Sequence, residues 1–89
     1  MKAVVTVVGK DRVGIIASVC VKLAEYNINV LDISQTVMQG YFTMMMVVDV
    51  SAANLPLAMV CQQMDVHGQE MGVSIRVQRE DIFNAMHQV

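Results

Sequence analysis

The spacing of apolar residues changes several times along this chain, and the order of those changes restricts the fold more than any other feature. A β-branched run predicts a first strand over residues 2–8, buried on both faces: Val4, Val5, Val7 and Val8. The stretch 9–14, Gly-Lys-Asp-Arg-Val-Gly, then interrupts the strand. Beyond it, helical spacing predicts an amphipathic helix: Ile16, Val19, Cys20 and Leu23. Asn27 tolerates the left-handed conformation that ends helices, so we expect the helix to stop near it.

The rest of the chain repeats this alternation. A second strand is predicted from residue 28 or 29 to 38, and the Gln39-Gly40 turn joins it to a strand over 41–50. A second helix follows the capping segment 51–54, with Pro56 in its first turn and Gly72 at its end. Gly68 lies on the apolar stripe of this helix, where we expect it to let the backbone approach the sheet. A last strand is predicted over 73–78 and a short helix over 80–89.

The predicted order, β-α-β-β-α-β plus a helical tail, is that of an α+β ferredoxin-like sandwich, with two helices on one sheet face. We expect a single domain over residues 1–89, with a core at 2–79 and a tail at 80–89. The other sheet face has no helix of its own unless the tail folds over it. Residues 44–48 would then be poorly covered in a monomer, which predicts a homodimer.

Composition narrows the possible partners. Hydrophobic residues make up 55% of the chain and charged residues 16%. This is more apolar surface than one small core can bury, so we expect part of it to contact another subunit. The net charge of −2, without a basic cluster, argues against nucleic acid. We find neither a membrane-spanning run nor a signal peptide, and expect a cytoplasmic protein in which Cys20 and Cys61 stay reduced.

The turn before the first helix is the candidate site. Free N–H groups at a helix N-terminus bind carboxylates, and Gly14 leaves room for a ligand to reach the backbone. Asp11 suits the ammonium of an amino acid, Arg12 could assist its carboxylate, and Asn29 offers donors and an acceptor near the same edge. The alternative reading of the same residues is structural: Asp11 caps the helix, Gly14 lets it pack and Arg12 is solvated.

Other chemistry is disfavoured. His67 and His87 lack a second ligand at helical spacing, so we expect no metal and no cofactor. Asp32 and Asp49 are predicted to be strand-end or solvated carboxylates rather than an acid–base pair. An acylphosphatase-like activity would need a phosphate cradle, which Asp11 would repel. An RNA-recognition domain would need exposed aromatics on its central strands, where this chain has valines.

Three segments together resemble the ACT domain family: residues 8–16 with Asp11-Arg12-Val13-Gly14, residues 27–30, and Phe42-Thr43-Met44. The resemblance runs nearly the whole chain and is narrowest with the small stand-alone ACT proteins of the UPF0237 group. The chain is also similar to the halves of the glycine cleavage system transcriptional repressor and to the N-terminal domain of formyltetrahydrofolate deformylase.

The resemblance implies a dimer that binds an amino acid or a related ligand at the subunit interface. Carried over by position, the ligand-binding residues would be Asp11, Arg12, Val13, Gly14 and Asn29. Val13 departs from the proline that many members carry there. With no catalytic or DNA-binding domain in these residues, the expected function is regulatory and non-enzymatic, acting on an unidentified partner protein. The alternative is a protein–protein interaction module that binds no ligand.

Overall fold

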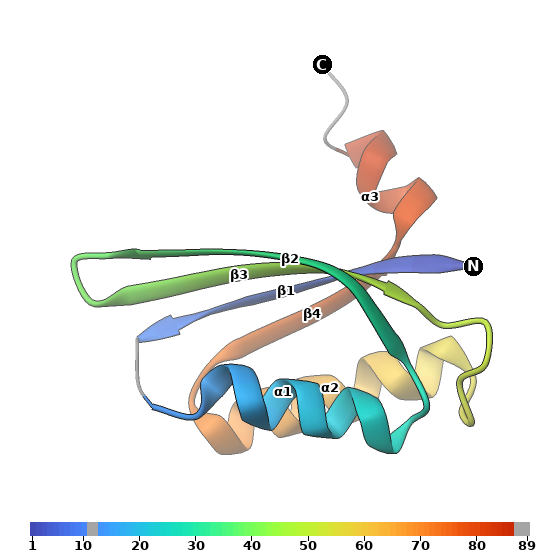
Figure 1. The fold of residues 1–89 in the computed structure, drawn as a ribbon, viewed down its shortest axis with the longest axis horizontal. Helices are drawn as coiled ribbons and strands as arrows, with labels where there is room; N and C mark the ends of the chain where they lie inside the picture. The colour runs from blue at the N-terminus through green and yellow to red at the C-terminus, as the bar shows by residue number, and fades with distance from the viewer. Residues whose placement is uncertain (11–12, 87–89) are drawn as a thin grey trace.

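The computed structural model describes residues 1–10 and 13–86 and confirms the predicted order of elements. The strands are β1 (Lys2–Lys10), β2 (Asn29–Met38), β3 (Tyr41–Asp49) and β4 (Ser74–Arg79), and the helices are α1 (Ile15–Glu25), α2 (Leu57–Met71) and α3 (Glu80–Met86). All strand pairs are antiparallel, and the sheet order is β2-β3-β1-β4. Helices α1 and α2 cover one face of the sheet, and α3 lies on the opposite side (Figure 1).

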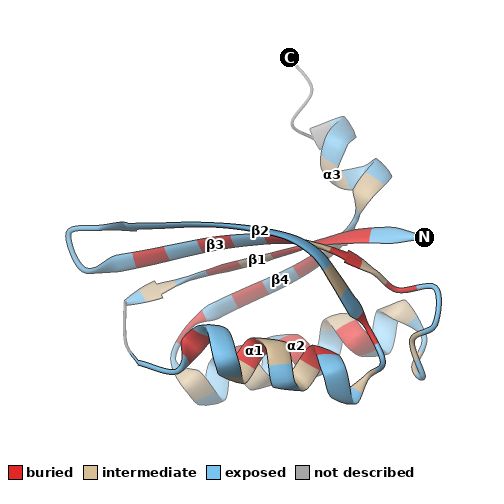
Figure 2. Cartoon of the chain, viewed as in Figure 1, coloured by how far each residue is buried: buried red, intermediate tan, exposed pale blue. Residues whose placement is uncertain are grey.

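The core lies between the sheet and the helix pair α1 and α2. Alternate strand residues point into it, including Val5 and Val7 of β1 and Met44, Met46 and Val48 of β3, all fully buried (Figure 2). The helices contribute their apolar stripes: Ile15, Val19 and Leu23 from α1, and Val60, Met64 and Gly68 from α2. The period-2 and period-3.6 patterns of the sequence therefore meet in one core.

This arrangement corrects the expectation that residues 44–48 are poorly covered in a monomer. Met44, Met46 and Val48 face α1 and α2 and are fully buried, because β3 lies inside the sheet rather than at its edge. Only the alternate side chains of this segment face the other side, where Met45 is 38% exposed. The apolar surface that remains open lies elsewhere, along β2.

Strand β1 is longer than predicted, because Gly9 does not interrupt it. Gly9 and Lys10 stay in register with Phe42 and Tyr41 of β3. A Cβ atom on Gly9 would lie 2.6 Å from Val73 Cγ1, so glycine is needed there for close packing rather than for a turn. The other predicted chain reversals are confirmed: Asn27 (φ 58°) follows α1, and Gln39-Gly40 joins β2 to β3.

Candidate functional site

Helix α1 begins without a side-chain cap from any residue that the structure describes. Its N-cap residue is Gly14, in the left-handed conformation (φ 92°), and none of the described side chains forms a capping hydrogen bond there. The first intrahelical bond runs from the Ser18 N–H to the Gly14 carbonyl, so the preceding N–H groups have no acceptor within the helix. The N-cap residue is therefore Gly14, and the alternative prediction, that Asp11 caps the helix, concerns a residue outside the described part of the chain.

Space around this helix end is open. A Cβ atom on Gly14 would meet nothing within 4 Å, and the Val13 side chain is fully exposed. The first turn of α1 itself carries no acidic residue, so no side-chain charge within that turn opposes an approaching anion. Asp11 and Arg12, the two charged residues predicted to bind ligand, lie outside the described residues.

Asn29 lies at the opposite end of the sheet from Gly14, which corrects the expectation that the two share an edge. Asn29 opens β2 and pairs with Asp49, which pairs in turn with Lys2 at the start of β1. The end of β1, Lys10, pairs instead with Tyr41, beside the end of β2 (Figure 1). The 11 residues of α1, about 16 Å of helix, separate the two positions within one chain.

The outer edge of the sheet is apolar and open. Strand β2 has a neighbour on one side only, and its residues from 31 to 38 are all exposed. Large apolar side chains contribute to this edge: Leu31, Ile33, Val37 and Met38, with Tyr41 across the turn. An exposed edge strand of this length offers both unpaired backbone groups and apolar surface to another chain.

The titratable residues of the described chain form no catalytic constellation. Asp49 accepts a hydrogen bond from the Ser51 N–H at 2.9 Å and lies 3.7 Å from the N-terminal ammonium, while Asp32 accepts one from the N–H of the next residue. The Ser51 hydrogen bonds lower the pKa of the Asp49 carboxyl. Within residues 1–10 and 13–86, no three His, Cys, Asp or Glu side chains gather as metal ligands. None of the described helices is long and apolar enough to cross a membrane.

Comparison with known proteins identifies the family. The ACT domain family model matches residues 2–78, and a UPF0237 protein of Listeria innocua is 54% identical over 100% of both chains. The chain belongs to the ACT domain family. An ACT domain protein from Streptococcus pneumoniae superposes with a TM-score of 0.83 at 46% identity, covering 98% of each chain. A formyltetrahydrofolate deformylase from Pseudomonas syringae shares the fold over 88% of this chain and 27% of its own, with a TM-score of 0.79 at 22% identity.

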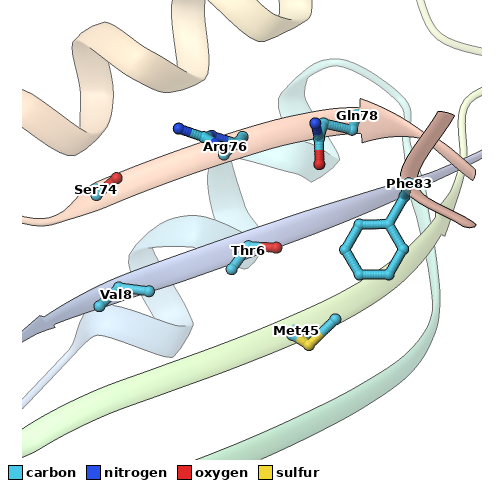
Figure 3. Close-up of a pocket in the computed structure, with 7 residues that line it drawn as sticks. All are labelled: Thr6, Val8, Met45, Ser74, Arg76, Gln78 and Phe83. Carbon is cyan, nitrogen blue, oxygen red and sulfur yellow. The ribbon is translucent and has the colours of Figure 1, made fainter. Parts of the chain in front are cut away.

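The ACT domain also has a groove that the sequence patterns did not predict as a site. It lies on the sheet face opposite α1 and α2, has a volume of about 360 Å³, and is bordered by α3 (Figure 3). The described residues that line it are Thr6, Val8, Met45, Ser74, Arg76, Gln78 and Phe83. The alternation of polar and apolar residues in β4 indicated that Ser74, Arg76 and Gln78 share a face. What the sequence could not indicate was that Phe83 of the tail lies over that face.

Proposed function

We propose that this ACT domain is a non-catalytic, cytoplasmic sensing module that binds a small amino acid as a homodimer and acts on a partner protein. The observation that supports this most is the uncapped N-terminus of α1 at Gly14. Its free N–H groups and the positive end of the helix dipole favour a carboxylate. The neighbouring Asp11 supplies a negative charge for the ammonium, and Arg12 a second donor for the carboxylate.

In a homodimer, Asn29 of one protomer could lie close to the loop 11–14 of the other, although the two are far apart within one chain. If two β2 edges pair antiparallel about a twofold axis, the start of one β2 meets the end of the other. The end of β2, at Met38, lies at the same end of the sheet as the end of β1, at Lys10, because both pair with Tyr41 of β3, and residues 11–14 follow Lys10 in the sequence. Asn29 of one copy would thereby approach the ligand loop of the other, so each site would draw on both chains.

The exposed side chains of β2 support this arrangement. Val37 is 54% exposed and Met38 67%, and pairing of two edges would satisfy the unpaired backbone groups and cover part of this apolar surface. The same edge also favours the runner-up function, a protein–protein interaction module without ligand, in which a different protein adds its strand to β2. The two functions differ in whether an amino acid binds.

The test is a thermal-shift and calorimetric screen of the twenty amino acids, alongside a mass measurement in solution. Ligand at a hundred times its dissociation constant should add about 2.7 kcal/mol of stability. Asp11→Ala should abolish the response, and the control Asp65→Ala, an exposed acid on α2, should keep it. No response to any amino acid would refute the sensor and leave the interaction module. A mass of 9.8 kDa at high concentration would refute the dimer.

A further inference from the structure

Among the described residues that line the groove beside α3, Arg76 alone is charged. Along β4, Arg76 lies between Ser74 and Gln78, and across the sheet it pairs with Thr6 of β1 (Figure 3). The ion pairs in the described part of the chain involve other cations: Arg79 with Asp81, Lys22 with Glu25, and the N-terminus with Asp49. Among the described residues, Arg76 therefore has no ion-pair partner, and none of the described residues that line the groove is acidic.

Around this cation the lining is divided into a polar and an apolar part. The hydroxyls of Thr6 and Ser74 can donate to an anion held at Arg76. Val8, Met45 and Phe83 form the apolar part, with Phe83 reaching over the sheet from α3 (Figure 3). Such a combination of an apolar wall and a few convergent polar groups is typical of small-molecule sites, and 360 Å³ falls in their size range.

Helix α3 is held on this face, so the apolar wall is part of the fold. At the junction between β4 and α3, the exposed Asp81 forms an ion pair with Arg79 at 3.2 Å and accepts a hydrogen bond from the Ile82 N–H at 3.0 Å. Val4 points to the same face as Thr6 and is only 5% exposed, although α1 and α2 lie on the other side. The tail thus covers part of the sheet and leaves the groove next to it.

We propose that this groove binds a small organic carboxylate that carries an apolar group and no ammonium. A guanidinium fork matches one carboxylate in charge and geometry, whereas a phosphate dianion calls for more than a single cation. An amino acid would bring an ammonium into a groove whose described lining holds no acidic residue, so none of those side chains offsets the desolvation cost. The apolar group of the ligand packs against Phe83 and Met45. This site is separate from loop 11–14 and does not depend on it.

Amide-resolved NMR titration tests the proposal with matched ligands. The probes are 3-phenylpropanoate and 4-methylpentanoate, each compared with the amino acid of the same skeleton, phenylalanine and leucine. The carboxylates should bind saturably and shift the amides of Thr6, Ser74 and Gln78, and the two amino acids should leave those amides unshifted. Arg76→Gln should weaken binding about tenfold or more, and Arg76→Lys less, because lysine keeps the charge but loses the fork.

Two control variants separate the groove from general effects. Lys22→Gln removes the same charge on the opposite side of the molecule, and Ile82→Ala shortens the neighbour of Phe83 outside the groove. Both should bind as wild type does, whereas Phe83→Ala should weaken binding with the far-UV spectrum unchanged. The proposal is overturned if neither carboxylate saturates up to about 10 mM. It is equally overturned if Arg76→Gln binds as wild type, or if the shifted amides belong to residues 13–16.

Discussion

The carbonyl oxygen of Val73 lies 2.8 Å from the point where a Cβ atom on Gly68 would stand, and the Val73 N–H donates to the Gly68 carbonyl at 2.9 Å. This contact holds the end of α2 against the start of β4. It explains why a glycine, which weakens a helix interior, lies on the buried stripe of α2.

Gly68→Ala should therefore destabilise the protein, although alanine is the better helix former. The new methyl group meets backbone, which cannot rotate away, and we expect a loss of about 1–2 kcal/mol of unfolding free energy. Urea denaturation measures it, with Gln62→Ala on the exposed face of α2 as control. A Gly68→Ala protein as stable as wild type would show that the close approach is relaxed in solution.

A polar contact joins the two helices at Ser18 and His67. The Ser18 hydroxyl oxygen lies 3.0 Å from His67 Nε2, part-buried between α1 and α2. Ser18→Ala and His67→Ala should each cost about 1 kcal/mol, and the double variant little more than either, since both remove the same hydrogen bond. Strictly additive losses in this double-mutant cycle would contradict the pairing.

Asp49 should make the stability of the fold sensitive to acid. The hydrogen bonds from Ser51, with the N-terminal ammonium, lower the pKa of Asp49 in the folded state. The stabilisation is thus present above the unfolded pKa, near pH 4, and is lost as pH falls through the folded value. Asp49→Asn should be less stable than wild type at neutral pH, with the difference vanishing in acid. Urea midpoints measured from neutral to acid pH check this, and an Asp49→Asn protein as stable as wild type at neutral pH would contradict it.

The Cys61 thiol should react slowly with alkylating reagents in the folded protein. Burial raises the pKa of its sulfhydryl, which also donates to the Val77 carbonyl at 3.3 Å. At pH 8 we expect Cys61 to react with iodoacetamide much more slowly in the folded protein than in urea, because the thiolate is the nucleophile. Peptide mass spectrometry of the labelled protein gives the rate at this site. Equal rates in the folded and unfolded protein would contradict the burial of this side chain.

Most of the fold could be predicted because each element has one clear period. The apolar stripe with Val60, Met64 and Gly68 indicates the helix α2. The period-2 spacing in β3 indicates that Met44 and Met45 point to opposite faces of the sheet. The prediction that Gly9 interrupts the first strand was wrong. Glycine is needed there because of close packing against Val73, which is distant in the sequence. The position of α3 on the sheet depends on tertiary contacts, so the groove at Arg76 could not be predicted from local patterns.

The candidate site was predicted less well than the fold. The local signal, an acidic residue followed by a glycine before a predicted helix, placed Gly14 at the start of α1, where it is the N-cap residue, and ligand binding there remains a prediction. The error on Asn29 was topological: β1 and β2 both pair antiparallel with β3, so they run parallel, and the start of β2 lies beside the start of β1. Because Asn29 and the ligand loop are far apart within one chain, a site that uses both must take them from two chains, and this can be tested.

Complementation between two defective variants tests that central claim most directly. Asp11→Ala and Asn29→Ala proteins should each fail to bind the amino acid found for wild type. If each site takes its loop from one chain and Asn29 from the other, an equal mixture forms heterodimers that carry one intact site. Calorimetry of the mixture should then recover about a quarter of the wild-type sites, at wild-type affinity. Binding that stays absent after subunit exchange would contradict a site shared between two chains.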